Sequence, residues 1–201
     1  LTFSDEPFTY WFEPTMSGTY LMRISVEDAA GNYYYDEVEV EVNNDDIDTS
    51  YRYVIDLEYG YAIPIPWEWP AFDDYELDDG RIQTIVGNID STINIYIETY
   101  DATELDDAQY VIEDYVYDTD MILIDDPTPI ELNGYDGYRV YYEIDYDGDP
   151  FNGEILSIFV PESETVYTFD FEVMEGLEQE AEPVRDMLYT KTRLFEPVDL
   201  E

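Results

Sequence analysis

The side chains best placed to do chemistry lie in one short acidic run, from Asp145 to Glu154. Oxygen-bearing residues recur there at alternate positions, as the ligand set of a hard cation such as calcium requires. The run is not an EF-hand, because Gly148 and Pro150 occupy the wrong places and the twelfth position falls on Leu156. The alternative, which we favour, is a solvated hairpin turn. The candidate calcium ligands are Asp145, Asp147, Asp149, Asn152 and Glu154.

A second candidate site is aromatic. Trp67 and Trp69 lie close to Tyr59 and Tyr61, and together these rings could form a platform for a sugar. Trp67 and Trp69 are therefore the candidate ligand-binding residues. The alternative is that the rings are buried, because aromatic side chains supply large apolar areas to a core.

Catalysis has few residue types to draw on. The chain has no histidine and no cysteine, which excludes Ser-His and Cys-His machinery, disulfides and ordinary zinc sites. Acidic pairs are too frequent for any one of them to mark a glycosidase, which needs two carboxylates at a fixed separation across a cleft. We therefore expect no enzyme, no catalytic residues and no certain cofactor, with calcium as the one cofactor considered.

The charge of the chain is extreme. Fifty-one acidic residues face seven basic ones, a net charge of -44, which disfavours binding to nucleic acid or to anionic membranes. Three explanations compete: a halophilic surface screened by molar salt, neutralisation by calcium outside the cell, and an acidic habitat that protonates carboxylates. We rank them in that order. No apolar run of about 20 residues is present, so no membrane span is expected in this chain.

The elements that would position these residues are clearest between residues 130 and 173. Asn133-Gly134 and Asp147-Gly148 supply the positive-φ residues of tight turns, and residues 138–145 alternate between apolar and polar between them. Residues 155–160 are apolar on both faces except Ser157, as in a central strand covered on both sides. A third strand follows at residues 167–173. The pattern predicts a three-stranded antiparallel meander.

Helices are expected before and after this meander. Thr103 and Asp106 resemble a capping box, and apolar residues recur at helical spacing from Leu105 to Tyr115. Pro183 is placed for the first turn of a second helix, whose Val184, Met187 and Leu188 would point inward. One helix would cover each face of the sheet. Further strands are expected at residues 53–57, 61–66, 81–86, 92–98 and 121–124, with an extended segment at 192–194.

The first forty residues form strands of a different kind. Alternating segments at residues 8–12, 19–26 and 38–42 are separated by turns at Ser17-Gly18 and Asp28 to Asn32. The Gly-Thr-Tyr strand, the Asp-x-x-Gly-Asn turn and the final valine-alternating strand resemble the C-terminal half of polycystic-kidney-disease (PKD) and related immunoglobulin-like repeats. The resemblance covers about residues 6–43, and the first half of such a repeat is absent. It implies a secreted or surface protein, and a chain that either begins inside a domain or completes the sandwich with a strand from elsewhere.

The remainder resembles the PsbP family over about residues 51–196. The segments that carry this resemblance are Tyr59 to Trp67, Leu132 to Tyr138, Tyr167 to Phe169 and Pro183 to Leu188. It implies an α/β/α sandwich whose members mostly bind or stabilise larger assemblies. It carries over no catalytic residue.

These interpretations combine into one expectation. The fold class is α+β, with a partial PKD/Ig-like β domain at 1–43, an acidic linker at 44–50 and a PsbP-like antiparallel sheet flanked by helices at 51–201. The protein resembles an archaeal-type acidic surface protein, and we expect a non-catalytic structural or adhesion component of an envelope, filament or appendage, found outside the cell or on its surface. Its partners would be other surface-protein subunits or copies of itself, without nucleic acid. The alternative is a calcium- or glycan-binding module attached to a larger secreted enzyme.

Overall fold

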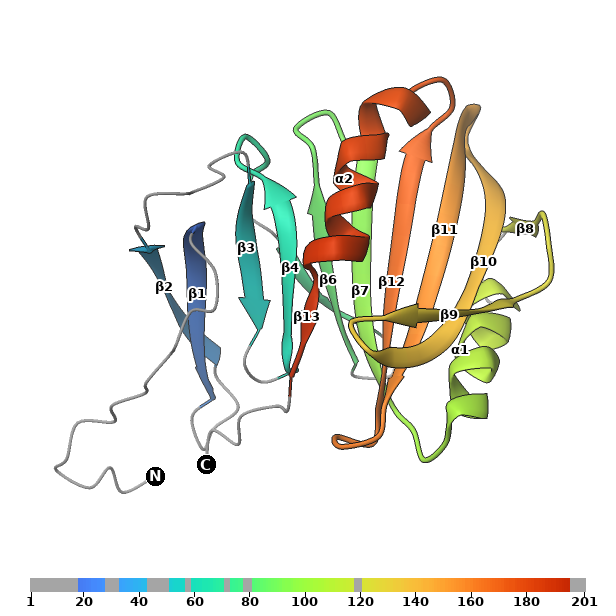
Figure 1. The fold of residues 1–201 in the computed structure, drawn as a ribbon. Helices are drawn as coiled ribbons and strands as arrows, with labels where there is room; N and C mark the ends of the chain where they lie inside the picture. Colours follow the sequence, from blue (N-terminus) through green and yellow to red (C-terminus); the bar gives the residue numbers. More distant parts are fainter. Residues whose placement is uncertain are drawn as a thin grey trace, which may run out of the picture.

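In a computed structural model, the described residues form two β-sheets and two helices, an α+β fold (Figure 1). The residues that it describes are 18–27, 33–42, 51–56, 59–70, 73–77, 81–117 and 121–195. Most strand pairs in both sheets are antiparallel.

The first sheet has five strands within the described residues. Strands β1 and β3 pair in parallel, and the other strand pairs of this sheet are antiparallel. Two prolines, Pro64 and Pro66, lie in β4. The neighbouring strand β13 reaches only Tyr61 and Ala62 of β4, so the prolines face no ladder partner there, as expected for an edge or exit. The strand order is β13 (Arg193–Leu194), β4 (Tyr61–Pro66), β3 (Tyr51–Asp56), β1 (Gly18–Glu27) and β2 (Tyr33–Val42).

The second sheet has eight strands in the described part of the chain: seven follow one another along its path, and the eighth, β9 (Thr128–Leu132), also pairs with β10. Every pair in this sheet is antiparallel. The order is β5 (Asp73–Glu76), β6 (Ile82–Gly87), β7 (Ile93–Asp101), β12 (Thr165–Met174), β11 (Asp149–Val160), β10 (Tyr135–Tyr146) and β8 (Ile122–Leu123).

One helix covers each face of this second sheet, as predicted (Figure 1). Helix α1 (Leu105–Tyr117) buries Ile112 against one face, with Val140, Ile144 and Ile155. Helix α2 (Glu178–Lys191) and strands β3 and β4 cover the other face and form the larger core with it. Neither helix in the described ranges combines the length and apolar composition needed to cross a membrane.

The predicted meander is confirmed as β10, β11 and β12. Asn133 and Asp147 have φ of 56° and 57°, and the glycines that follow them have φ of 86° and 101°. These left-handed conformations close the tight turns that the Asn-Gly and Asp-Gly pairs predict. Strand β11 is buried on both faces from Ile155 to Val160, apart from a partly exposed Phe159.

The N-terminal strands are present at β1 and β2, but the described residues do not show an immunoglobulin-like sandwich. Strand β1 instead joins β3 in parallel, with Thr19 opposite Arg52. The predicted strand at residues 8–12, the turn at Asp28 to Asn32 and the linker at 44–50 lie outside the described residues. The predicted division of the chain into a 1–43 domain and a 51–201 domain stays a prediction.

The start of α2 corrects one prediction. The helix begins at Glu178, so Pro183 lies inside it rather than in its first turn. Backbone amides of Glu180 and Ala181 already donate to the carbonyl of Leu177, which fixes the earlier start. Pro183 therefore costs the helix one hydrogen bond. The inward face is as predicted, with Val184 and Leu188 buried.

The start of α1 corrects the prediction that Asp106 caps this helix. The capping carboxylate is Asp107, not Asp106: its Oδ2 accepts hydrogen bonds from the backbone amides of Thr103 at 2.7 Å and Glu104 at 3.1 Å. These bonds lower the pKa of Asp107. They satisfy amides that the first turn of a helix leaves without partners.

Removing this cap should weaken α1. We expect Asp107→Ala to lower the melting temperature more than Asp106→Ala, because the two carboxylates are neighbours in sequence but only Asp107 holds the amides of residues 103 and 104. Thermal unfolding by circular dichroism measures both variants under the same conditions. Equal losses would show that the helix start does not depend on this carboxylate.

Candidate functional site

The structure does not gather the five candidate calcium ligands. Asp145, Asp147 and Asp149 are exposed around the β10–β11 turn, where Asp145 Oδ1 accepts a hydrogen bond from the amide of Gly148 at 2.6 Å. Asn152 donates to Glu178 Oε1 at 2.9 Å, and Glu154 is only 4% exposed. Within the described ranges, no three acidic residues are arranged to hold a metal ion. Asp145, Asp147 and Asp149 therefore lie in an exposed turn, apart from Glu154, and the calcium site stays a prediction.

The two candidate tryptophans are not equivalent either. Trp69 is buried in the larger core, whereas Trp67 is 44% exposed. The guanidinium of Arg52 lies 5.7 Å from the Trp67 ring and donates to the carbonyl of Trp69 at 2.6 Å. Of these two candidates, Trp67 is therefore the one whose ring is open to solvent.

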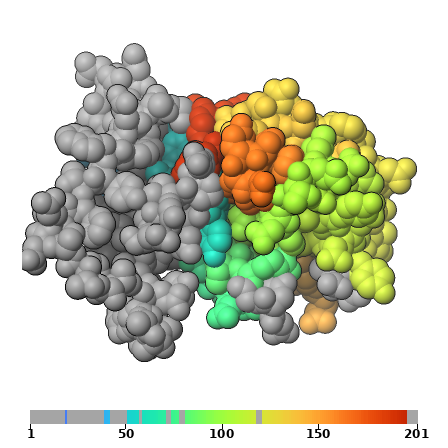
Figure 2. Space-filling model, turned by 90° about the horizontal axis from the view of Figure 1, so that it is seen from below, coloured from blue at the N-terminus to red at the C-terminus, as the bar shows by residue number. Residues whose placement is uncertain are grey.

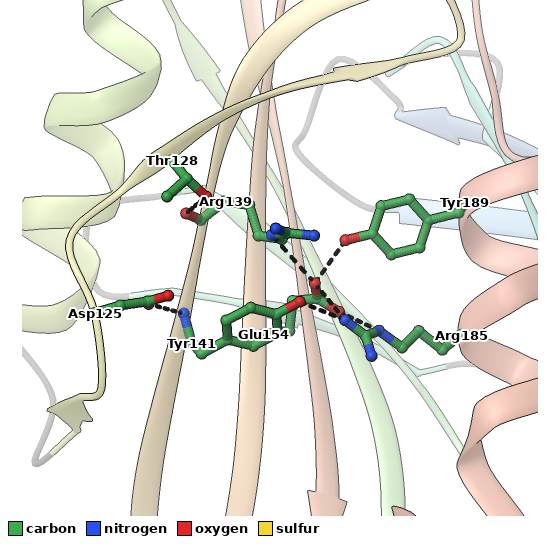
Figure 3. A network of polar contacts seen from close by, with 7 residues as sticks. All are labelled: Asp125, Thr128, Arg139, Tyr141, Glu154, Arg185 and Tyr189. Carbon is green, nitrogen blue, oxygen red and sulfur yellow. Dashed lines mark hydrogen bonds and ion pairs between the residues drawn. The ribbon is translucent and has the colours of Figure 1, made fainter.

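Glu154 is instead the centre of a polar network between the second sheet and α2 (Figure 3). Arg185 of α2 binds it with two hydrogen bonds, from Nε at 2.7 Å and from a terminal nitrogen at 2.9 Å. Tyr189, one turn further along α2, donates its hydroxyl to Glu154 at 2.6 Å. This bidentate pairing raises the pKa of Arg185 further above its usual value. The carboxylate of Glu154 is thereby neutralised and fully engaged.

A second arginine extends the network. Arg139 Nε lies 3.8 Å from Glu154, and the guanidinium groups of Arg139 and Arg185 lie 5.0 and 5.5 Å from the ring of Tyr141. The Tyr141 hydroxyl accepts a hydrogen bond from Arg185. The backbone of Tyr141 is held in turn by Asp125, whose carboxylate accepts its amide at 3.0 Å (Figure 3). The network thus joins β10, β11, α2 and the segment that precedes β9.

This arrangement ties α2 to strands β10 and β11 of the second sheet. Both oxygens of the Glu154 carboxylate accept hydrogen bonds, one from Arg185 Nε and the other from a terminal nitrogen of Arg185 and the Tyr189 hydroxyl. A cavity of about 370 Å³ lies beside it, and its wall includes Asn152, Glu178 and Glu182 together with Glu154 and Arg185. Sequence reasoning named Glu154 but missed its partners. The available signal was the scarcity of basic residues: the chain has only seven, and two of them, Arg139 and Arg185, lie beside Glu154.

A second group of carboxylates is buried on the opposite face of the sheet, beneath α1. Glu98 of β7 and Asp170 and Glu172 of β12 are 4%, 1% and 1% exposed. Glu98 has a cation: Arg81 binds it at 2.7 Å, and Gln83 and Tyr100 also donate to it. This is a conventional buried ion pair with its remaining acceptors satisfied.

Asp170 and Glu172 are held by tyrosines. The Tyr142 hydroxyl lies 2.6 Å from Asp170 Oδ1 and 2.8 Å from Glu172 Oε1. Tyr115 of α1 donates to Asp170 at 3.1 Å, and Tyr146 of β10 donates to Glu172 at 2.8 Å. Burial raises the pKa of both carboxyl groups.

An open hollow lies at one end of the molecule, where α1 begins. Figure 2 shows the turn between β11 and β12, in orange, beside the start of α1, in light green. The amide of Ala102 donates to the carbonyl of Glu164 at 2.8 Å and holds the two segments together. The hollow has a volume of about 530 Å³ and is lined by Tyr100, Tyr110 and several acidic residues. Its acids are solvated or, like Asp107, engaged in capping.

Comparison with known proteins identifies the fold. No family model and no curated protein sequence matches the chain. Among solved structures, the cyanobacterial PsbP protein (CyanoP) of Synechocystis sp. PCC 6803 aligns with a TM-score of 0.54 and 13% identity, over 78% of this chain and 99% of that one. This likeness confirms the PsbP-like fold predicted from the sequence.

Two further structures align less closely. A protein of Bacteroides thetaiotaomicron VPI-5482 gives a TM-score of 0.48 at 12% identity, over 72% of this chain and 48% of that one. LpqN of Mycobacterium tuberculosis, described as involved in cell envelope biogenesis, gives 0.46 at 10% identity, over 87% of this chain and 91% of that one.

Proposed function

We propose that this chain is a non-catalytic component of an assembly outside the cell or on its surface, and that copies associate through the β8 edge of the second sheet. The observation that carries the proposal is the exposure of three consecutive apolar residues at this edge. Ile122, Leu123 and Ile124 are 67%, 40% and 58% exposed. A strand whose side chains are apolar and open to solvent on both faces is suited to contact with another protein.

The backbone of this segment is paired on one side only. Leu123 and Ile122 pair with Tyr142 and Glu143 of β10, and the amide of Ile124 donates to the carbonyl of Tyr141 at 2.9 Å. In the described part of the chain, β8 ends the order of the second sheet. Its outer side therefore offers hydrogen-bonding groups to an added strand.

Charge gives a contact between two copies a salt requirement. The apolar run is flanked by Asp118 and Asp120 on one side and Asp125 and Asp126 on the other. Two antiparallel copies would bring these aspartates near one another. At about 0.1 M salt charges act over about 10 Å, but over only about 3 Å at 1 M, so molar salt removes most of the repulsion. A surface location and a saline habitat follow as parts of the same proposal.

The internal carboxylates support a non-catalytic role. Glu154 and Glu98 are each neutralised by an arginine and hydrogen-bonded to a tyrosine. These carboxylates therefore hold neighbouring segments of the protein together. The PsbP-like fold adds no reaction, because a fold alone does not specify one.

Sedimentation of the full chain tests the proposal. We expect concentration-dependent association in molar sodium chloride that is lost in dilute buffer, because the flanking aspartates then repel. Leu123→Lys should weaken association at least tenfold in molar salt, since it places a charge on the apolar edge. Ile89→Lys is the matched control, because Ile89 is apolar and 84% exposed but lies in the turn between β6 and β7.

Two results would overturn the proposal. A wild-type chain that stays monomeric in molar salt at high concentration has no such edge contact. Equal weakening by Leu123→Lys and Ile89→Lys would show that the association does not use β8. A chelator at constant ionic strength should leave the association unchanged, which separates this role from the calcium-binding alternative.

A further inference from the structure

The buried pair of Asp170 and Glu172 shares a single hydroxyl donor, which is one proton short of a separate hydrogen bond to each acid when both are ionised. One hydroxyl, that of Tyr142, lies 2.6 Å from an oxygen of Asp170 and 2.8 Å from an oxygen of Glu172. Both distances are those of O–H···O hydrogen bonds. A tyrosine hydroxyl carries one proton, and an ionised carboxylate carries none. If both acids were ionised, a single proton would have to serve two acceptors.

The other donors do not remove the deficit. Tyr146 donates to the same Glu172 oxygen that Tyr142 approaches, and Tyr115 donates to the second oxygen of Asp170. Neither hydroxyl lies between the two acids. The hydroxyl of Tyr96 also approaches Glu172, but it does not bridge to Asp170, and the second oxygen of Glu172 is buried and makes no hydrogen bond of standard geometry within the described residues.

We infer that Asp170 and Glu172 together bind one proton in the folded protein at neutral pH, so that one carboxyl group donates to the Tyr142 oxygen while Tyr142 donates to the other. This is a buried proton-binding site. The arrangement leaves one negative charge on the pair, where two ionised carboxylates would repel each other in a medium of low dielectric.

The surroundings of the pair favour one charge, not two. Helix α1 presents Tyr115, β10 presents Tyr142 and Tyr146, and the neighbouring strand β7 presents Tyr96 and Glu98. The strand between the acids and Tyr142, β11, contributes Gly153, which has no side chain. No arginine or lysine of the described part forms an ion pair with Asp170 or Glu172. Arg81 is bound to the neighbouring acid, Glu98.

Burial acts in the same direction. Asp170 is 1% exposed, and desolvation raises its pKa well above the usual value, with the charge of Glu172 as the next cause. Desolvation also raises the pKa of Glu172, opposed by the hydroxyl hydrogen bonds that it accepts. Because the pair titrates as a unit, the proton belongs to both residues.

A retained proton makes folding dependent on pH. In the unfolded chain both acids ionise above about pH 4. Above that pH the folded state holds one proton more than the unfolded state. The bound proton therefore stabilises the fold fully at low pH, and this stabilisation is lost as the pH rises toward the raised pKa of the pair. Across that window the unfolding equilibrium constant should increase tenfold per pH unit.

Urea unfolding in molar sodium chloride tests this, because the salt screens the many surface carboxylates. The full chain is compared with Asp170→Asn, whose amide donates without a titrating proton. We expect the wild type to show the tenfold dependence per pH unit from weakly acidic to neutral pH, and Asp170→Asn to lose it. Glu98→Gln is the matched control: it removes an equally buried acid that already has a cation, so it should keep the dependence even where it lowers stability.

A second measurement needs no variant. Carboxyl carbon resonances of wild-type protein labelled with carbon-13 should show one acid of the pair still protonated at neutral pH, while exposed aspartates are fully ionised. Two fully ionised carboxylates at neutral pH would overturn the inference. So would a pH dependence of unfolding that is the same in wild type and Asp170→Asn.

Discussion

Replacing Gly153 with alanine is expected to destabilise the fold by about 3 kcal/mol, the upper part of the range for overpacked cores. Gly153 lies between Tyr142 of β10 and Glu172 of β12 in the ladder register. The Tyr142 ring crosses β11 at this position, and a methyl group on residue 153 would lie 1.9 Å from its Cζ atom. Tyr142 is fully buried, so the ring cannot move away without losing its hydrogen bonds to both acids.

A double-mutant cycle separates this clash from a general intolerance of the strand. In a Tyr142→Ala background the obstacle is gone, and Gly153→Ala should then cost less than about 1 kcal/mol by urea unfolding. The coupling between the two sites should therefore exceed about 2 kcal/mol. If Gly153→Ala costs the same in both backgrounds, the glycine is required for another reason and the Tyr142 crossing does not explain it.

The part of the fold that sequence reasoning predicted best is local in origin. Asn133-Gly134 and Asp147-Gly148 set tight turns through their own backbone conformations, so the meander follows from a few neighbouring residues. The same holds for the inward residues of α2, whose spacing alone places Val184 and Leu188 on one face. The errors at the helix starts are also local: Asp106 and Asp107 are both acidic, and the pattern does not choose between them.

The burial of Asp170 and Glu172 was not predicted, because apolar and polar residues alternate along β12. In β12, Tyr167, Phe169, Phe171 and Val173 form the apolar face, so Asp170 and Glu172 on the other face would be assigned to solvent. The structure covers that second face with α1 and with tyrosines from β10. The tyrosine ring packs as an apolar group, but its hydroxyl can donate a hydrogen bond to a buried carboxylate, as Tyr115 and Tyr142 do to Asp170. The number of tyrosines, 22, was the only signal.

The network around Glu154 depends on contacts between distant segments. Arg185 is 31 residues from Glu154, and Tyr189 is 35 residues away. Within the sequence, Glu154 closes an acidic run and invites assignment to a cation site with Asp145 and its neighbours. Strand geometry decides otherwise, because the exposed turn ends before Glu154 and the following residues enter the sheet between β10 and β12.

Replacing Arg185 with methionine should reveal what this network contributes. Methionine keeps much of the apolar stem but leaves Glu154 nearly buried without its bidentate partner. We expect a loss of about 2 kcal/mol by urea unfolding, below the usual cost of breaking a buried pair, because Arg139 lies 3.8 Å away and Arg185 is itself 38% exposed. Lys191→Met is the control on the same helix. Lys191 contacts the ring of Tyr51 at 5.2 Å, and its loss should cost less than about 1 kcal/mol.

Whether a second substitution restores stability identifies the cause of the loss in Arg185→Met. If the penalty arises from an unpaired buried charge, adding Glu154→Gln to Arg185→Met should restore stability, because the neutral amide needs no cation and its oxygen can still accept the Tyr189 hydroxyl. If the penalty arises only from lost packing of the arginine stem, the double variant should be no more stable than Arg185→Met. Recovery that persists in molar salt would place the charge in the interior, since screening by salt reaches exposed pairs far more than buried ones.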